Sequence, residues 1–266
     1  MSVIERALQK SRAELAPSMG RSSLLMPRTG PSHAVPPPPP PESRRADVNA
    51  ALAEKWATLL HPSDAAAVRA YKILRTQLLR RLEKNAGLVA ITAVSVGDGK
   101  TVTSLNLALS LARDVNTRVV LVDLDLQRPS IARYLGMSAE VGLDAYLAGR
   151  ASVNDVFHDI GVERLTVVPT LNPVADSSDA LRSPAMMEFF DTLRRQRCVA
   201  LLDLPPMLLG DDVLALTPHA DGVLLVVGEG NTPRSALAEA RNVLSEMNVL
   251  GVVLNRSAER DDSKYY

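Results

Sequence analysis

The residues whose types and spacing point most directly to chemistry are those of "SVGDGKT", residues 95–101. The string lies between an apolar run and an amphipathic stretch, so it reads as strand, turn and helix. Glycines let a backbone wrap closely around a phosphate with its amide groups pointing inward, and the lysine adds a cation for the outer phosphates. A threonine hydroxyl at the first turn of a helix can hold Mg²⁺ beside the anion. The string therefore predicts a phosphate-binding loop.

The loop residues that we expect to bind a nucleotide are consecutive in the sequence. They are Val96, Gly97, Asp98, Gly99, Lys100, Thr101 and Val102. The full phosphate-loop pattern also has a glycine five positions before Gly99, where this chain has Val94. The string alone is thus a weak signal, which other parts of the chain must support.

Acidic residues end two further apolar runs, "VVLVDLDLQRP" with Asp123 and Asp125, and "VALLDLPP" with Asp203. Ligands of open parallel sheets bind outside the carboxyl ends of the strands, and Mg²⁺ takes oxygen ligands while it keeps several waters. The alternative is that each aspartate only caps a following helix. The three carboxylates together favour a site for a magnesium–nucleoside triphosphate.

Six apolar runs alternate with helical patterns from Leu88 onward and predict the fold that positions these residues. The runs are "LVAITAV", "RVVLVDL", "LTVVP", "CVALLDL", "GVLLVV" and "LGVVLN". Helices are expected between them at about residues 100–113, 183–196 and 233–247. Strands that are apolar on both faces and separated by helices indicate an α/β fold of the P-loop NTPase class. Its central sheet should be mostly parallel, with helices on both faces.

The composition changes along the chain and predicts four segments. Residues 1–15, "MSVIERALQKSRAEL", form a short amphipathic helix with a basic polar face. Residues 16–45 form a disordered Pro-rich linker, in which six consecutive prolines span roughly 19 Å at about 3.1 Å per residue. Residues 46–255 form the P-loop domain, and residues 256–266 form a flexible tail that contains tyrosines.

Composition also restricts the function classes. Lys+Arg and Asp+Glu both total 30 and aromatic residues make up 3%, so neither a global positive field nor an aromatic platform favours a nucleic-acid partner. Cys198, the single cysteine, excludes an internal disulfide and opens an apolar run, so we expect it in the core. Neither an apolar stretch of ~18 residues nor a signal peptide is present, and a cytoplasmic location is expected.

A basic helix is expected at about residues 63–84, after another at about 48–60. Its basic residues are Arg69, Lys72, Arg75, Arg80, Arg81 and Lys84. A solvated helix face explains them, and so does contact with another subunit or an acidic partner. The sequence leaves these alternatives open.

The three nucleotide motifs together resemble those of the bacterial tyrosine autokinases (BY-kinases) of exopolysaccharide and capsule loci. The resemblance covers about residues 64–255. The opening "MSVIERALQKSRAE" is similar to the subgroup encoded beside exosortase-type loci, in which the kinase is separate from its membrane activator. The resemblance implies ATP and Mg²⁺ as cofactors and a role in the regulation of polysaccharide synthesis and export. It also implies autophosphorylation of the tail, here at Tyr265 and Tyr266.

The resemblance implies roles for individual residues. Lys100 would neutralise the transferring phosphoryl group, Asp123 would be the base for the incoming tyrosine, and Asn255 would lie on the adenine side. The implied magnesium ligands are Thr101, Asp125 and Asp203. Lys100, Asp123 and Asp125 are therefore the expected catalytic residues.

The implied partner is a membrane polysaccharide chain-length determinant (co-polymerase), with self-association of the kinase. Peripheral contact with the inner face of the plasma membrane would come through that partner or the N-terminal helix. The family's oligomerisation motif, Glu-x-x-Arg-x-x-Arg, aligns with Arg69, Lys72 and Arg75, so a ring that uses the glutamate cannot form unchanged. Val96 also replaces a proline, and Gln127 an arginine, of the family pattern.

The alternative function is an ATPase switch of the ParA/MinD type, which changes partner when ATP binds and phosphorylates no protein. Those relatives have a lysine where this chain has Ser95. Its absence and the tail tyrosines favour the kinase.

Overall fold

The computed structural model describes residues 43–50, 53, 65–82 and 86–257. The chain divides into two units, Met1–Pro36 and Pro37–Tyr266, and every described residue belongs to the second. The predicted N-terminal helix, most of the predicted linker, most of the helix expected at 48–60 and the tail from residue 258 lie outside the described residues.

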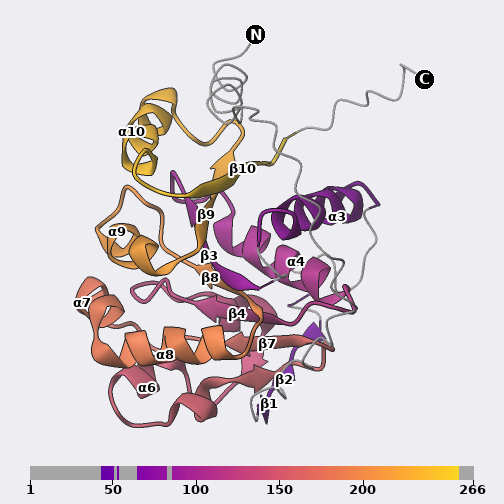
Figure 1. The fold of residues 1–266 in the computed structure, drawn as a ribbon, viewed down its shortest axis with the longest axis vertical. Helices are drawn as coiled ribbons and strands as arrows, with labels where there is room; N and C mark the ends of the chain where they lie inside the picture. The colour runs from indigo at the N-terminus through magenta and orange to yellow at the C-terminus, as the bar shows by residue number, and fades with distance from the viewer. Residues whose placement is uncertain (1–42, 51–52, 54–64, 83–85, 258–266) are drawn as a thin grey trace, which may run out of the picture. The chain divides into compact units, whose positions relative to one another are not determined.

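An eight-stranded sheet runs through the second unit in the order β1-β6-β7-β4-β8-β3-β9-β10 (Figure 1). Its neighbouring strands are parallel except for β6 and β7, which are antiparallel. Its strands are β1 Arg44–Arg45, β3 Gly87–Ala93, β4 Val119–Asp123, β6 His158–Asp159, β7 Leu165–Val168, β8 Val199–Asp203, β9 Gly222–Gly228 and β10 Val249–Asn255. A separate antiparallel pair joins β2 Asp47–Val48 to β5 Met137–Ser138.

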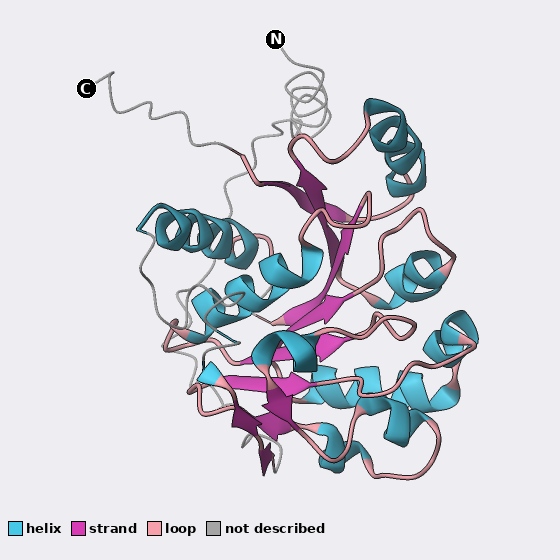
Figure 2. Cartoon of the chain, turned by 180° about the vertical axis from the view of Figure 1, so that it is seen from behind, coloured by secondary structure: helices cyan, strands magenta, loops and turns pink. Residues whose placement is uncertain are grey.

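Helices cover both faces of the sheet (Figures 1 and 2). Helices α3 and α4 pack on one face, and α8, α9 and α10 pack on the other. The helices are α3 Ala65–Leu79, α4 Lys100–Ala112, α5 Ile131–Leu135, α6 Leu143–Leu147, α7 Ser177–Arg182, α8 Pro184–Arg195, α9 Asp212–Leu216 and α10 Arg234–Leu244, with short 3₁₀ helices at Val153–Val156 and Thr217–His219. The mostly parallel sheet between two helical layers confirms the predicted α/β fold.

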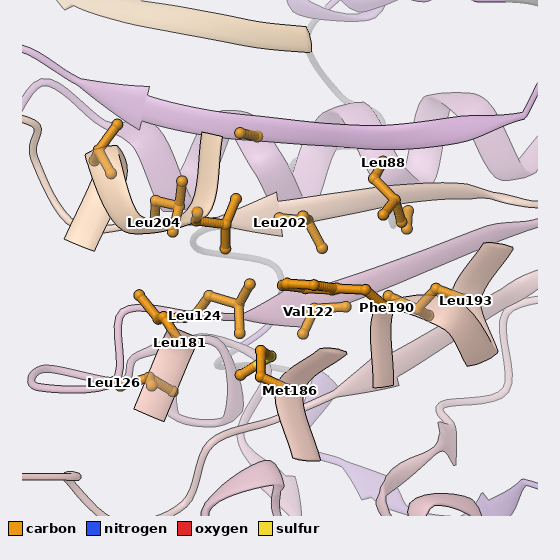
Figure 3. Close-up of a cluster of buried hydrophobic side chains, with 14 of the residues drawn as sticks. Leu88, Val122, Leu124, Leu126, Leu181, Met186, Phe190, Leu193, Leu202 and Leu204 are labelled. Atoms are coloured by element: carbon orange, nitrogen blue, oxygen red, sulfur yellow. The ribbon is translucent and has the colours of Figure 1, made fainter. Parts of the chain in front are cut away.

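Burial on both faces explains the long apolar runs. Every residue of β4, β8 and β9 is buried, as expected for central parallel strands. Figure 3 shows the cluster on the α8 side, where Val122, Leu202 and Phe190 come from β4, β8 and α8. Cys198 is 4% exposed, which confirms it as a core residue, and burial raises the pKa of its thiol to about 12.

Local signals set the start of α8. Ser183 is the N-cap, and its hydroxyl oxygen accepts a hydrogen bond from the backbone N–H of Met186 at 3.2 Å. Pro184 follows at the first position, where its missing N–H costs nothing. Phe189 and Leu193, four residues apart, then point the apolar face of α8 into the core. The helix therefore begins one residue after the predicted start.

The short edge elements were not predicted. Segment 44–48 supplies β1 and β2, and its Arg44 N–H donates to the carbonyl of Phe157 at 2.9 Å. The Arg44 side chain also forms an ion pair with Asp155. Strands of two residues that contain arginine and aspartate leave no apolar run in the sequence, so their pairing is set by contacts between distant segments.

His158 is a buried ionisable residue of β6, with 3% of its surface exposed. Its Nε2 lies 2.7 Å from the carbonyl oxygen of Val141 and must donate to it, while its Nδ1 is buried without a hydrogen-bond partner among the described residues. Burial lowers the pKa of His158, the Val141 bond opposes this, and the Arg44 charge lowers it further. The folded state therefore favours the neutral form of the His158 imidazole over the protonated form.

We expect the contribution of His158 to the unfolding free energy to fall as the pH drops below about 6.5, because the unfolded imidazole then takes a proton that the folded one resists. His158→Phe removes this contribution, so the unfolding free energy of the variant should rise relative to that of the wild type as the pH falls from about 7 to about 5. Urea unfolding of both proteins across this range measures the two slopes. Equal slopes would show that His158 contributes nothing to the pH dependence.

Candidate functional site

The parallel strands bring the predicted site residues to one edge of the sheet. Asp123 ends β4 and Asp203 ends β8, and the two residues are partners in the β4–β8 register. Strand β3 is the other neighbour of β8 and leads directly into residues 95–101. The glycine-rich loop therefore lies beside two strand ends that carry carboxylates.

The loop needs its glycines for two different reasons. Gly97 and Gly99 have φ angles of +84° and +90°, in the left-handed region that side chains with a Cβ avoid. A Cβ on Gly99 would also lie 2.1 Å from Nδ2 of Asn255. Helix α4 begins at Lys100, directly after Gly99, so its free N-terminal amides are available for an anion.

Lys100 lies between two carboxylates. Its Nζ is 3.0 Å from Oδ2 of Asp125 and 3.2 Å from Oδ2 of Asp203. Burial acts to lower the pKa of Lys100, but the charges of Asp203 and then Asp125 outweigh it and the pKa is raised. Lys100 is therefore a firmly protonated cation.

Asp203 is fully buried and accepts hydrogen bonds at both oxygens. Its Oδ2 accepts from the Thr101 hydroxyl at 2.7 Å, and its Oδ1 from the Ser104 hydroxyl at 2.8 Å. Sequence reasoning missed Ser104. Its position four residues after Lys100 places both on one face of α4, and this spacing was the signal that could have identified it.

Asp123 has a different environment from the other two carboxylates. It is fully buried, and its Oδ2 accepts from the backbone N–H groups of Ser130 at 2.8 Å and Ile131 at 2.9 Å, where α5 begins. Burial and the nearby Asp203 charge raise the pKa of Asp123 to about 7, although the two N–H groups oppose this. Asp123 thus holds the start of α5, the use that the helix-capping alternative expects.

The oxygen atoms of Thr101, Asp125 and Asp203 suit a hard cation such as Mg²⁺, which binds few protein ligands in nucleotide sites. Within the part of the chain that the structure describes, His, Cys, Asp and Glu side chains form no group of three that could hold a metal ion. A cation here would therefore need phosphate oxygens and the Thr101 hydroxyl to complete its coordination. This donor set fits a metal that arrives with a nucleotide.

The remaining predicted residues fall into three places. Asn255 ends β10, and its Nδ2 donates to the backbone carbonyl of Asp98 at 2.8 Å, so it belongs to the same site as the loop. The Asp98 side chain is buried, whereas Val96 is 58% exposed. Tyr265 and Tyr266 lie outside the described residues.

The basic face of α3 includes a residue with a structural contact. Arg75 donates from Nη1 to the backbone carbonyl of Ser110 on α4 at 2.9 Å, and the Ser110 hydroxyl donates to the carbonyl of Tyr71 at 3.1 Å. These bonds join α3 to the helix that carries Lys100. At least one basic residue of this face, Arg75, therefore stabilises the packing of α3 against α4.

Comparison with known proteins gives consistent matches. Residues 89–266 match the CobQ/CobB/MinD/ParA nucleotide binding domain. EpsB of Ralstonia solanacearum is 34% identical over 199 residues, which cover 72% of this chain and 26% of EpsB. The tyrosine-protein kinase CpsD of Streptococcus pneumoniae serotype 4 is 30% identical over 173 residues, which cover 64% of this chain and 75% of CpsD. This chain thus spans about a quarter of EpsB but three quarters of CpsD.

A solved structure agrees with these matches. The VpsO kinase domain superposes with a TM-score of 0.64 at 29% identity, and the match covers 73% of this chain and 95% of that domain. Among the described residues, none of the helices has the length and apolar character that a bilayer crossing requires.

Proposed function

We propose that this chain, which belongs to the CobQ/CobB/MinD/ParA nucleotide-binding family and within it to the bacterial tyrosine kinases, is an ATP-dependent protein tyrosine autokinase. The observation that carries the proposal is the cluster of Lys100 with Asp125 and Asp203 at the end of a glycine-rich loop. A cation and oxygen ligands at a helix N-terminus are the groups that phosphoryl transfer needs, because it relies on positioning and electrostatics.

In this proposal Lys100 exchanges its carboxylate partners for phosphate oxygens when the nucleotide binds. The first amides of α4 contribute further donors to the phosphates. Thr101, Asp125 and Asp203 would hold Mg²⁺, which when bound neutralises charge on the phosphate oxygens. Ser104 keeps the Asp203 carboxylate oriented, because its hydroxyl donates to Oδ1 while the Thr101 hydroxyl donates to Oδ2.

Asp123 is the proposed base. Two N–H groups occupy its Oδ2, whereas Oδ1 accepts, among the residues that the structure describes, only from the backbone N–H of Asp125, at 3.3 Å. Because a carboxylate oxygen has two lone pairs, Oδ1 keeps capacity for a tyrosine hydroxyl. Asn255 is the proposed contact on the adenine side, and the hydrogen bond from its Nδ2 to the backbone carbonyl of Asp98 supports this role.

The proposed phosphoacceptors are Tyr265 and Tyr266. Each phosphate would add a charge of roughly −1.5 to −2 beside Asp261 and Asp262, and this repulsion would weaken contacts between subunits or with a partner. We propose a membrane co-polymerase as that partner and polysaccharide synthesis and export as the regulated process. Contact with the cytoplasmic face of the membrane would come through the partner or residues 1–15.

Incubation of the full chain with ATP and Mg²⁺, followed by mass spectrometry of the C-terminal peptide, tests the proposal. We expect phosphate on Tyr265 or Tyr266, and more of it when the cytoplasmic segment of the co-polymerase is added. The double variant Tyr265→Phe, Tyr266→Phe keeps both rings and should lose the label. Hydrolysis of ATP with an unmodified tail under both conditions would instead support the ATPase switch.

A further inference from the structure

The phosphate loop carries a carboxylate of its own, Asp98, which is fully buried. Its Oδ2 accepts from the backbone N–H of Ser95 at 2.8 Å. Its Oδ1 accepts from Nδ2 of Asn231 at 2.7 Å and from the hydroxyl of Thr232 at 2.8 Å. Burial of a charge is costly unless hydrogen bonds compensate it, so these three donors are what allow a negative group inside a loop suited to anions.

Two of these donors come from the connection between β9 and α10, residues 229–233. Asn231 also donates to the carbonyl of Val96 at 3.1 Å, and the Thr232 hydroxyl accepts from the N–H of Gly228 at 3.2 Å. Nδ2 of Asn255 adds a hydrogen bond to the backbone carbonyl oxygen of Asp98. We call Asp98, Asn231, Thr232 and Asn255 the Asp98 latch, because together they join the phosphate loop to the ends of β9 and β10.

The sheet order shows which end of a nucleotide the latch faces. Strand β3, which leads into the loop, lies between β8 and β9. Asp125 and Asp203, with Lys100, mark the β4–β8 side as the place of the outer phosphates. A nucleotide that follows the loop must then place its nucleoside on the β9–β10 side, where the latch lies.

We infer that Asp98 is a positioning residue for the nucleoside end of the ligand. It holds connection 229–233 and Asn255 against the loop before the nucleotide arrives, so their contacts with the nucleoside need no ordering step. The inference rests on the proposed nucleotide binding and deepens it. It assigns to Asp98 a role that differs from direct contact with phosphate.

Two ligands separate this role from a general role in loop folding. ADP has a nucleoside and tripolyphosphate has none, and calorimetry in Mg²⁺ measures the affinity of the full-length protein for each. Thr232→Val removes one donor to Asp98, together with the acceptor of the Gly228 N–H, while keeping the side-chain shape. We expect it to weaken ADP binding about tenfold, the effect of one hydrogen bond to a charged group, and to leave tripolyphosphate binding unchanged.

Two more variants make the test sharper. Thr232→Ser keeps the hydroxyl and should restore ADP affinity. Gly228→Ala reaches the same contact from β9, because its Cβ would lie 2.7 Å from Oδ1 of Asp98 and 3.2 Å from the Asp98 Cα, and it should weaken ADP binding.

The outcomes that overturn the inference are distinct from those that overturn the function. Equal losses for both ligands in Thr232→Val would mean that Asp98 only maintains the fold of the loop, and unchanged ADP affinity in Thr232→Val and Gly228→Ala would remove the role altogether. A wild-type protein that binds neither ligand would overturn the proposed nucleotide site itself.

Discussion

Lys100→Met is expected to lower the rate of tyrosine phosphorylation by about 10²- to 10³-fold, the usual cost of removing one preorganised group that stabilises charge in a transition state. Methionine keeps an unbranched side chain that is one atom shorter, but it has no charge to offer the phosphoryl group. Single-turnover measurement of phosphate incorporation with ATP and Mg²⁺ reports this step directly. A rate equal to that of the wild type would exclude Lys100 from the reaction.

The same substitution has a second effect, because Lys100 bridges Asp125 and Asp203. Removal of a partner from a buried ion pair destabilises a protein by about 3–5 kcal/mol, so Lys100→Met must be checked for folding by urea unfolding. Lys100→Arg keeps the cation and should stay closer to the wild type in stability. It should still lose most of the rate, since a planar guanidinium cannot replace a point charge. Arg241→Met, on the exposed side of α10, is the surface control and should retain the rate.

Asp203→Asn is expected to raise the Mg²⁺ concentration needed for half-maximal activity and to lower the maximal rate by about 100-fold or more, as loss of metal-borne charge stabilisation costs several kcal/mol. The amide has one oxygen where the carboxylate has two, and Thr101 and Ser104 both donate to this group. A Mg²⁺ titration of the initial rate, at saturating ATP, measures both effects.

The control for Asp203→Asn is a second buried carboxylate, Asp144 on α6, which forms no hydrogen bond or ion pair with Lys100 or Thr101 among the described residues. Asp144 is 6% exposed and accepts from the N–H of Leu171 and from Asn172, both at 2.9 Å. Asp144→Asn should therefore lower stability in a similar way but leave the Mg²⁺ requirement unchanged. If the two variants shift the Mg²⁺ requirement equally, Asp203 acts on stability alone.

The central fold and the inner part of the site could be predicted because a local pattern encodes them. Strands β4 and β8 are buried throughout, so each leaves an apolar run that ends in aspartate. Parallel strands place such ends at one edge, and this geometry brings Asp125 and Asp203 to Lys100.

The rest depends on contacts between distant segments. The two-residue strands β1 and β6 pair residues 114 positions apart, Arg44 with His158, and their sequence has no apolar periodicity. The orientation of Asp123 toward the amides of α5 depends on the path of the loop after β4, which composition does not specify. The Asp98 latch likewise joins side chains 133 and 134 positions apart.

The strand order has a consequence for how signals can travel in this protein. Strand β1, next to the first described residue, and β10, just before the last, are the two outermost strands of the sheet. Seven interstrand spacings of about 4.8 Å separate them by roughly 30 Å. Within the described part of the chain, Arg44 and Asn255 therefore lie at opposite edges of the sheet, and a signal that the sheet carries from one to the other would cross every strand between them.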